Sequence, residues 1–447
     1  MKKIELSDHF TCGKLLLYSL PAIGQVLAIT SFQMVDGFFV STYLGVVPFS
    51  AVDIISPAFF LLYGIGLMFG SGTGALVSKI MGEGNQPRAK QVFTMSVTVM
   101  ALIGILLGSL ATVFLPTLAV WAGASSDNLP YCVAYGRLLT AFLPAYLINS
   151  CFMELWITAE KGWIGTLIAV MNGGLNVLFD WWFMGPLGWG IQGAGLATSL
   201  AAVVSAVFTL VYFFRKNSSS LCFVRFQLNQ LRELFQICFN GASEMVDSIS
   251  GNITQLVMNI QLMRLFGEVG VAAMGVYTYV IEFFLVFFFG ISSTAITIVG
   301  YKYGEKNKKE INSLASNGIL LMLVFGILMS VLFFFLAGPV AQLYVGYDET
   351  AFALTTKVLR IASLTCLLYG FVIFTSSLFT GLNDGLTSAV IAGCNSLAAP
   401  VVMIYLLPAL FGADAIWYAI PAATFITAIL CAVLRRTQYP KLLKNLE

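Results

Sequence analysis

The sequence predicts an all-α polytopic membrane protein with twelve transmembrane helices in two six-helix lobes. Only 10% of its 447 residues are charged, against about 25% in an ordinary soluble protein. Hydrophobic residues make up 59% of the chain and the mean hydropathy is +0.89, so the chain holds more apolar surface than a water-facing fold could bury. A motif that returns at half the chain length indicates the division into two lobes.

Apolar runs of about 20 residues, the length that crosses about 30 Å of hydrocarbon, define the expected spans. In chain order the twelve runs lie near 15–40, 54–78, 92–121, 138–158, 163–184, 190–214, 234–263, 271–300, 313–337, 352–380, 387–410 and 415–434. The first run is too long for a signal-peptide core and lacks a clear cleavage site, so we expect it to be retained. No connector is long enough to form a soluble domain.

The positively charged residues divide unequally between the two sides of the membrane that these spans define. Of the 23 Lys and Arg, 19 fall on the side that holds both termini, and the other four are Arg137, Arg264, Lys357 and Arg360. Cytoplasmic segments carry an excess of Lys and Arg. We therefore expect both termini in the cytoplasm, an even number of spans, and a multi-pass protein of the plasma membrane.

An internal repeat supports the two lobes. The motif Gly82-Glu83-Gly84-Asn85 returns as Gly304-Glu305-Lys306-Asn307, a shift of 304 minus 82, or 222 residues. Two further pairs share nearly the same offset: Gly45 with Gly267, and Asn172 with Asn395. Because each half holds an even number of spans, the halves share one orientation, and their pseudo-twofold axis runs along the membrane normal. We expect an N-terminal lobe over 1–214, a cytoplasmic linker over 215–233 and a C-terminal lobe over 234–447.

Polar residues inside the spans are functional candidates, because a central charge costs about 2.5–3.5 kcal/mol on insertion scales. Asp36 closes the apolar run of the first span, and Pro21 earlier in that span is a candidate hinge. Asn172, Asn176 and Asp180 recur at i, i+4 and i+8 in the fifth span and share one helix face. That face must meet a partner helix or a water-filled cavity. For the asparagines, interhelical hydrogen bonding worth about 0.6 kcal/mol per bond is the alternative interpretation.

The seventh span carries a second polar stripe, which we expect to line a substrate cavity from the second half of the chain. Its members recur at helical spacing or lie beside that face: Glu244, Asp247, Ser248, Gly251, Asn252, Gln255 and Asn259. Glu282 in the eighth span is a further candidate for the cavity, and Glu154 lies in the fourth span. For both glutamates the alternative is pairing with a neighbouring polar group.

Several function classes are excluded by the sequence. It contains no P-loop, no HExxH and no GxSxG at a strand-to-helix turn, so the soluble-enzyme classes marked by these motifs are excluded and we expect a secondary transporter rather than an enzyme. The eight cysteines lie far apart without CxxC, and His9 is the single histidine, which argues against zinc, haem and a disulfide scaffold. The net charge of +2 and the absence of a basic stripe argue against a nucleic-acid partner.

Four segments resemble the multidrug and toxic compound extrusion (MATE) family of the MOP superfamily, and the resemblance covers nearly the whole chain. In chain order they are LPAIGQVLAITSFQMVDGFFVSTYLG, GALVSKIMGEGNQPRAK, NGGLNVLFDWWFMGPLGWGIQGAGLATSLA and GISSTAITIVGYKYGEKN. The resemblance implies a V-shaped cleft and the export of organic cations, drugs or other amphipathic small molecules by alternating access, in exchange for H+ or Na+. It implies no cofactor beyond that coupling ion, and we expect a monomer in the lipid bilayer.

The resemblance also implies a cation-coupling site in the N-terminal lobe, formed by Asp36, Asn176, Asp180 and Thr198 and able to hold H+ or Na+. The tenth span, 352–380, has no acid to match a coupling aspartate found in other branches. Charge neutralisation at Asp36 and Asp180 is expected to favour one packing of the first, fifth and sixth spans and to bend the first near Pro21.

Two other function classes stay open. A flippase of related fold for a lipid-linked saccharide or lipid would need several cationic residues inside the cleft to hold phosphates, and the span interiors contain almost none. A membrane-embedded transferase or hydrolase would need a polar catalytic loop or a His- or Cys-based constellation.

Overall fold

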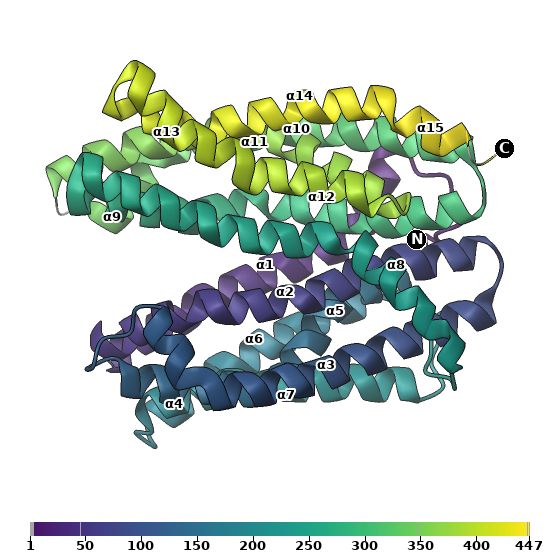
Figure 1. The fold of residues 1–447 in the computed structure, drawn as a ribbon, viewed down its shortest axis with the longest axis horizontal. Helices are drawn as coiled ribbons and strands as arrows, with labels where there is room; N and C mark the ends of the chain where they lie inside the picture. The colour runs from purple at the N-terminus through teal and green to yellow at the C-terminus, as the bar shows by residue number, and fades with distance from the viewer. Residues whose placement is uncertain (1–3, 45, 347, 445, 447) are drawn as a thin grey trace. The chain divides into compact units, whose positions relative to one another are not determined.

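The computed structural model describes residues 4–44, 46–346, 348–444 and 446, and within these ranges every regular element is a helix (Figure 1). In chain order the elements are α1 (Cys12–Leu44), α2 (Val46–Gly82), α3 (Gln86–Trp121), α4 (Leu129–Ala141), α5 (Leu143–Thr158), α6 (Gly162–Met184), α7 (Gly190–Phe214), the 3-10 turn η1 (Leu228–Arg232), α8 (Glu233–Asn240), α9 (Ala242–Gly304), α10 (Lys308–Val345), α11 (Glu349–Gly381), α12 (Gly385–Gly393), the π-helical turn η2 (Cys394–Ala398), α13 (Ala399–Phe411), the 3-10 turn η3 (Ala413–Tyr418), α14 (Ala419–Thr437) and α15 (Tyr439–Lys444).

Twelve spans follow from these helices. Among the described residues, ten helical stretches are long and apolar enough to cross a membrane, and α4 with α5 form an eleventh span that bends by 60°. Helix α9 counts twice: its 63 residues would measure about 95 Å at 1.5 Å per residue, three times the hydrocarbon thickness. Gly267 (φ 65°, ψ −154°) breaks α9 into two spans. The predicted twelve-helix fold is therefore confirmed.

The chain divides into two compact units, each built around its own set of helices. The first-half unit comprises Gly24–Gly241, and the second-half unit comprises Met1–Ile23 with Ala242–Glu447. In the first-half unit α2 packs along α5 and α6 along α7, and in the second-half unit α11 packs along both α9 and α10. Each half of the chain supplies six spans, and α1 contributes residues to both units.

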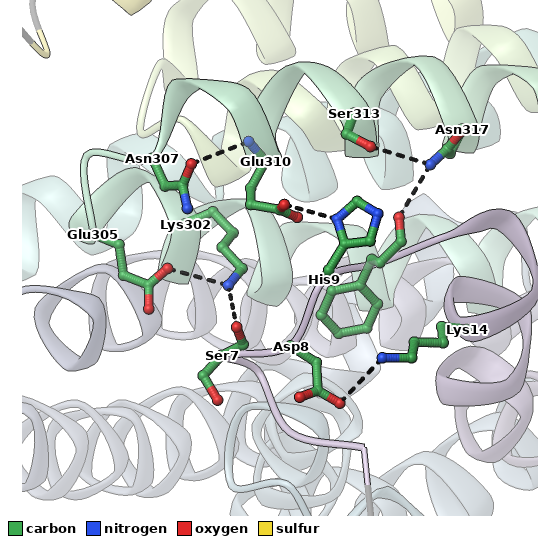
Figure 2. A network of polar contacts seen from close by, with 11 residues as sticks. Ser7, Asp8, His9, Lys14, Lys302, Glu305, Asn307, Glu310, Ser313 and Asn317 are labelled. Atoms are coloured by element: carbon green, nitrogen blue, oxygen red, sulfur yellow. Dashed lines mark hydrogen bonds and ion pairs between the residues drawn. The ribbon is translucent and has the colours of Figure 1, made fainter.

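The N-terminal residues pack with the second-half unit, whereas the sequence analysis placed them in the first lobe. At the end of α9, Nζ of Lys302 donates hydrogen bonds to the Ser7 carbonyl at 2.7 Å and to the Glu305 carboxylate at 3.1 Å (Figure 2). In α10, Nδ2 of Asn317 donates to the Phe10 carbonyl at 3.1 Å. These partners lie about 300 positions apart, so no local sequence pattern predicts their contact.

The repeated Gly-Glu-x-Asn motif has the same structural role in both halves. Asn85 Oδ1 accepts a hydrogen bond from the Arg88 amide at 3.2 Å, and Asn307 Oδ1 accepts one from the Glu310 amide at 3.2 Å. Each asparagine thereby caps the helix that follows it, α3 or α10. The residue before each cap has positive φ, 80° at Gly84 and 56° at Lys306. Of the other expected pairs, Gly45 lies outside the described residues.

Two spans are interrupted where the sequence predicted continuous helices. The span near 138–158 bends at Phe142, because Pro144 lacks the amide proton that would bond to the Thr140 carbonyl in a continuous helix and its ring would clash with that carbonyl. The span near 234–263 is divided at Gly241, because α8 ends at Asn240 and α9 begins at Ala242. A Cβ atom at Gly241 would lie 1.9 Å from the Met68 carbonyl oxygen, so glycine permits this close crossing of α2.

Candidate cation site

Three helices of the first-half unit bring the predicted cation-site residues together. Asn176 of α6 donates from Nδ2 to Asp36 Oδ1 of α1 at 3.3 Å and to Thr198 Oγ1 of α7 at 3.2 Å. The Thr198 hydroxyl in turn donates to the Ala194 carbonyl at 3.0 Å, which orients its lone pairs toward Asn176. The Asn176 side chain thus links α1 to α7.

Asp180 completes this group from the same face of α6, one turn beyond Asn176. Its side chain is fully buried and lies next to Asp36 and Asn176. Within the part of the chain that the structure describes, neither Asp180 carboxylate oxygen has a partner in good hydrogen-bonding geometry. Two adjacent buried carboxylates repel each other when both are charged. A proton or a small cation between them removes that repulsion and supplies the missing partner.

A close contact between α1 and α6 positions the carboxylates. A Cβ atom at Gly173 would lie 1.8 Å from the Phe32 ring, so only glycine allows the two helices to approach this closely. Asp36 lies one turn beyond Phe32, and Asn176 lies three residues beyond Gly173. Since both functional side chains follow the contact by about one helical turn, the contact brings them within hydrogen-bonding distance.

One neighbour of the site, a tyrosine, has no signal in the sequence. Tyr146 of α5 is buried, close to the charges of Asp36 and Asp180, and its hydroxyl lies 3.3 Å from Ser199 Oγ of α7. A lone tyrosine in an apolar span has no distinctive spacing, so only the tertiary structure identifies it. Asn172 lies on the same face of α6, but in the described structure its buried Oδ1 has no hydrogen-bond partner, so it stands outside the Asp36–Asn176–Thr198 network.

Part of the predicted second-half stripe also forms a polar cluster. Ser396 Oγ in the η2 turn donates to Asp247 Oδ1 of α9, and Thr254 Oγ1 donates to the Ser396 carbonyl at 2.5 Å. Both Glu244 and Asp247 lie close to the half-buried Tyr369 of α11. The π-helical turn η2 explains how a backbone carbonyl becomes available to Thr254, because such turns displace the regular helical hydrogen bonds.

The other predicted cavity residues do not join this cluster. Gln255 and Glu282 have exposed side chains, and Asn259 is half-buried. Glu282 lies on the second span of α9, beyond the break at Gly267. Pro21, the candidate hinge, lies inside α1, which stays helical through it.

The oxygen atoms of this candidate site would suit a proton or a hard monovalent cation. Its two carboxylates, one amide and one hydroxyl offer only oxygen atoms for coordination, which are the ligands that hard cations prefer. Among the described residues, no three His, Cys, Asp or Glu side chains gather as a multidentate metal centre would need.

Comparison with known proteins places these observations in a family. The profile of the MatE family matches residues 21–182 and 245–406, once in each half, and 245 minus 21 gives an offset of 224 residues, close to the internal repeat. The multidrug export protein MepA of Staphylococcus aureus (strain MSSA476) is 23% identical over 436 residues, covering 92% of this chain and 90% of MepA. MepA of Staphylococcus haemolyticus (strain JCSC1435) is 24% identical over 423 residues, with the same coverage.

Solved structures share the fold. An outward-facing multidrug resistance MATE transporter of the MOP superfamily superposes with a TM-score of 0.91 at 21% identity, covering 99% of both chains. A MATE crystal structure in the straight conformation gives a TM-score of 0.90 at 22% identity, again covering 99% of both chains.

Proposed function

Because this chain belongs to the MatE family of multidrug efflux transporters, which are secondary transporters and not enzymes, we propose that it exports amphipathic organic cations in exchange for H+ or Na+. The observation that carries this proposal is the adjacent carboxylate pair of half-buried Asp36 and fully buried Asp180, joined through Asn176 to Thr198. In a multi-pass membrane protein that transports small molecules, such a carboxylate pair can bind a cation, and the binding of that cation can drive transport of the substrate.

In the proposed cycle, H+ or Na+ from outside binds between Asp36 and Asp180 and neutralises their repulsion. Neutralisation stabilises one packing of α1, α6 and α7, because these are the helices that the site residues join. Coupling arises when the cation has different affinities for the outward- and inward-facing states. The membrane potential adds about 2.3 kcal/mol per charge for each 100 mV.

Pro21 is the proposed hinge of this cycle. The boundary between the two compact units falls between Ile23 and Gly24, so α1 is the helix that the units share. Proline weakens the helix there, since it removes one backbone hydrogen bond.

We assign substrate contact to the second-half residues Glu244, Asp247, Gln255, Asn259 and Glu282 and to Asn172 of α6. The excess of Lys and Arg supports cytoplasmic termini in the plasma membrane.

A related-fold flippase for lipid-linked saccharides is less well supported. Such a protein needs buried cations to hold phosphates. Among the described residues Lys302 is the single buried basic side chain, and it is bound to the Ser7 carbonyl and to Glu305. In the described ranges, no other basic side chain is fully buried, so none stands ready to hold a phosphate in the interior of either unit.

Ethidium efflux from proteoliposomes tests the proposal, with an imposed pH gradient in one arm and a sodium gradient in the other. We expect Asp36→Asn and Asp180→Asn each to lower gradient-driven efflux by at least about tenfold, the effect of losing roughly 1.4 kcal/mol of coupling. The exposed Asp127→Asn is the matched control and should transport at the parental rate. Pro21→Ala should slow efflux while leaving insertion unchanged. Parental efflux by correctly inserted Asp36→Asn protein would contradict the proposal.

A further inference from the structure

The segment that joins α7 to α9, residues 214–240, is firmly held in the first-half unit. The Val224 amide donates to Thr94 Oγ1 of α3 at 3.1 Å, and the Phe223 amide donates to the Phe213 carbonyl at 3.0 Å. Leu221 is fully buried. The segment is therefore a fixed surface of the protein.

Helix α8, at the end of this segment, has one face packed on α2. A Cβ atom at Gly72 would lie 2.0 Å from the Ile237 carbonyl oxygen, so the two backbones are in direct contact. Ile237 and Asn240 are fully buried on this face. An ion pair between Arg88 of α3 and Glu233 also ties down the start of α8. These contacts fix which face of α8 is left uncovered.

The uncovered face is an apolar stripe. Phe235 and Phe239, at i and i+4 of α8, are 79% and 38% exposed, and Leu231 in the preceding 3-10 turn η1 is 40% exposed. The rings of Phe235 and Phe239 stack with their centroids 6.1 Å apart. Aromatic and leucine side chains on one face of a short helix are typical of helices that lie in the membrane interface.

Uncompensated positive charge accompanies this stripe. Residues 214–240 contain one acid, Glu233, which pairs with Arg88, so the segment has four basic residues against one acid and a net charge of +3. The four basic residues are all exposed: Arg215, Lys216, Arg225 and Arg232. Basic clusters next to an apolar interfacial face are attracted to anionic phospholipids.

We infer that residues 214–240 form a binding surface for anionic phospholipid headgroups of the cytoplasmic leaflet. The stripe of Leu231, Phe235 and Phe239 enters the boundary between headgroups and acyl chains, and Arg225 and Arg232 contact the lipid phosphates. The choice of leaflet depends on the proposed cytoplasmic position of this connector. The surface would couple membrane composition to the stability of the segment that links the two units.

Thermal unfolding of the purified full-length protein tests this inference, with phosphatidylglycerol or phosphatidylcholine added to the detergent. We expect phosphatidylglycerol to raise the Tm more than phosphatidylcholine does. In Arg225→Gln with Arg232→Gln, the concentration of phosphatidylglycerol that gives half the rise should increase on the order of tenfold, because two surface charges are lost. Lys306→Gln with Lys309→Gln removes the same charge from another predicted cytoplasmic turn and should leave the rise unchanged.

The variant Phe235→Ser tests the contribution of the apolar stripe to lipid binding. Phe335→Ser in α10 is the control, because the two phenylalanines are similarly exposed, at 79% and 72%. We expect a weaker response to phosphatidylglycerol only in Phe235→Ser. Equal rises with the two lipids, or a full response in the double arginine variant, would overturn the inference. Because Tm is measured without any ion gradient, this outcome is independent of whether the transport proposal holds.

Discussion

At the scale of single residues, the proposed cation site depends on the carboxamide of Asn176. The same nitrogen donates to the Asp36 carboxylate and to the Thr198 hydroxyl, so one side chain holds α1 and α7 to α6. Sequence spacing predicted that Asn176 and Asp180 share a helix face, because helical periodicity is a local property. It could not predict Tyr146, whose position near the carboxylates arises from the packing of α5 on α7.

Asn176→Leu keeps the approximate size of the side chain and removes both hydrogen bonds. We expect a loss of about 1–3 kcal/mol in stability, the cost of leaving a buried polar partner unsatisfied, together with a severe loss of efflux. Asn172→Leu is the matched control for stability only, since Asn172 lies one turn earlier on α6 but is itself assigned to substrate contact. Thermal unfolding compares the two variants, and ethidium efflux compares Asn176→Leu with the parental protein. Equal unfolding temperatures of the two variants would show that Asn176 does not hold the site together.

At the scale of helices, glycines decide where backbones meet, and the consequences are not visible in the sequence. Gly173 and Gly174 are neighbours in α6, yet a Cβ atom at Gly173 would overlap the Phe32 ring and one at Gly174 would contact nothing within 4 Å. The apolar run over 163–184 predicts α6 correctly, but no local pattern distinguishes the two glycines. The bend between α4 and α5 and the end of α8 were missed because both depend on proline and glycine positions inside apolar runs.

Gly173→Ala and Gly174→Ala form a matched pair. We expect Gly173→Ala to separate α1 from α6, to cost about 1–3 kcal/mol through overpacking, and to lower efflux, because Asp36 then moves away from Asn176. Gly174→Ala should be close to neutral in both measurements. The prediction would be wrong if Gly173→Ala unfolded at the same temperature and transported as well as Gly174→Ala.

At the scale of the whole molecule, composition and the repeat predicted most of the architecture. Twelve spans, two halves and the family follow from apolar run length, from the 222-residue offset and from segment order. The packing of the N-terminal residues on α9 and α10 could not be predicted, because it joins parts of the chain about 300 residues apart. Of the polar residues that the sequence predicts in one second-half cavity, only some lie together in the structure. Asp247 forms a cluster with Ser396, whereas Glu282 lies on the other span of α9, beyond Gly267.

Displacement of the bound cation by drug most directly tests whether Asp36 and Asp180 form the coupling site. Purified protein in weakly buffered solution is titrated with ethidium while a pH indicator reports released protons, and a parallel arm measures bound radioactive sodium. We expect ethidium to displace one of these two ions from the parental protein and from Asp127→Asn, and neither ion from Asp36→Asn combined with Asp180→Asn. Displacement from the double variant equal to that from the parental protein would contradict the assignment.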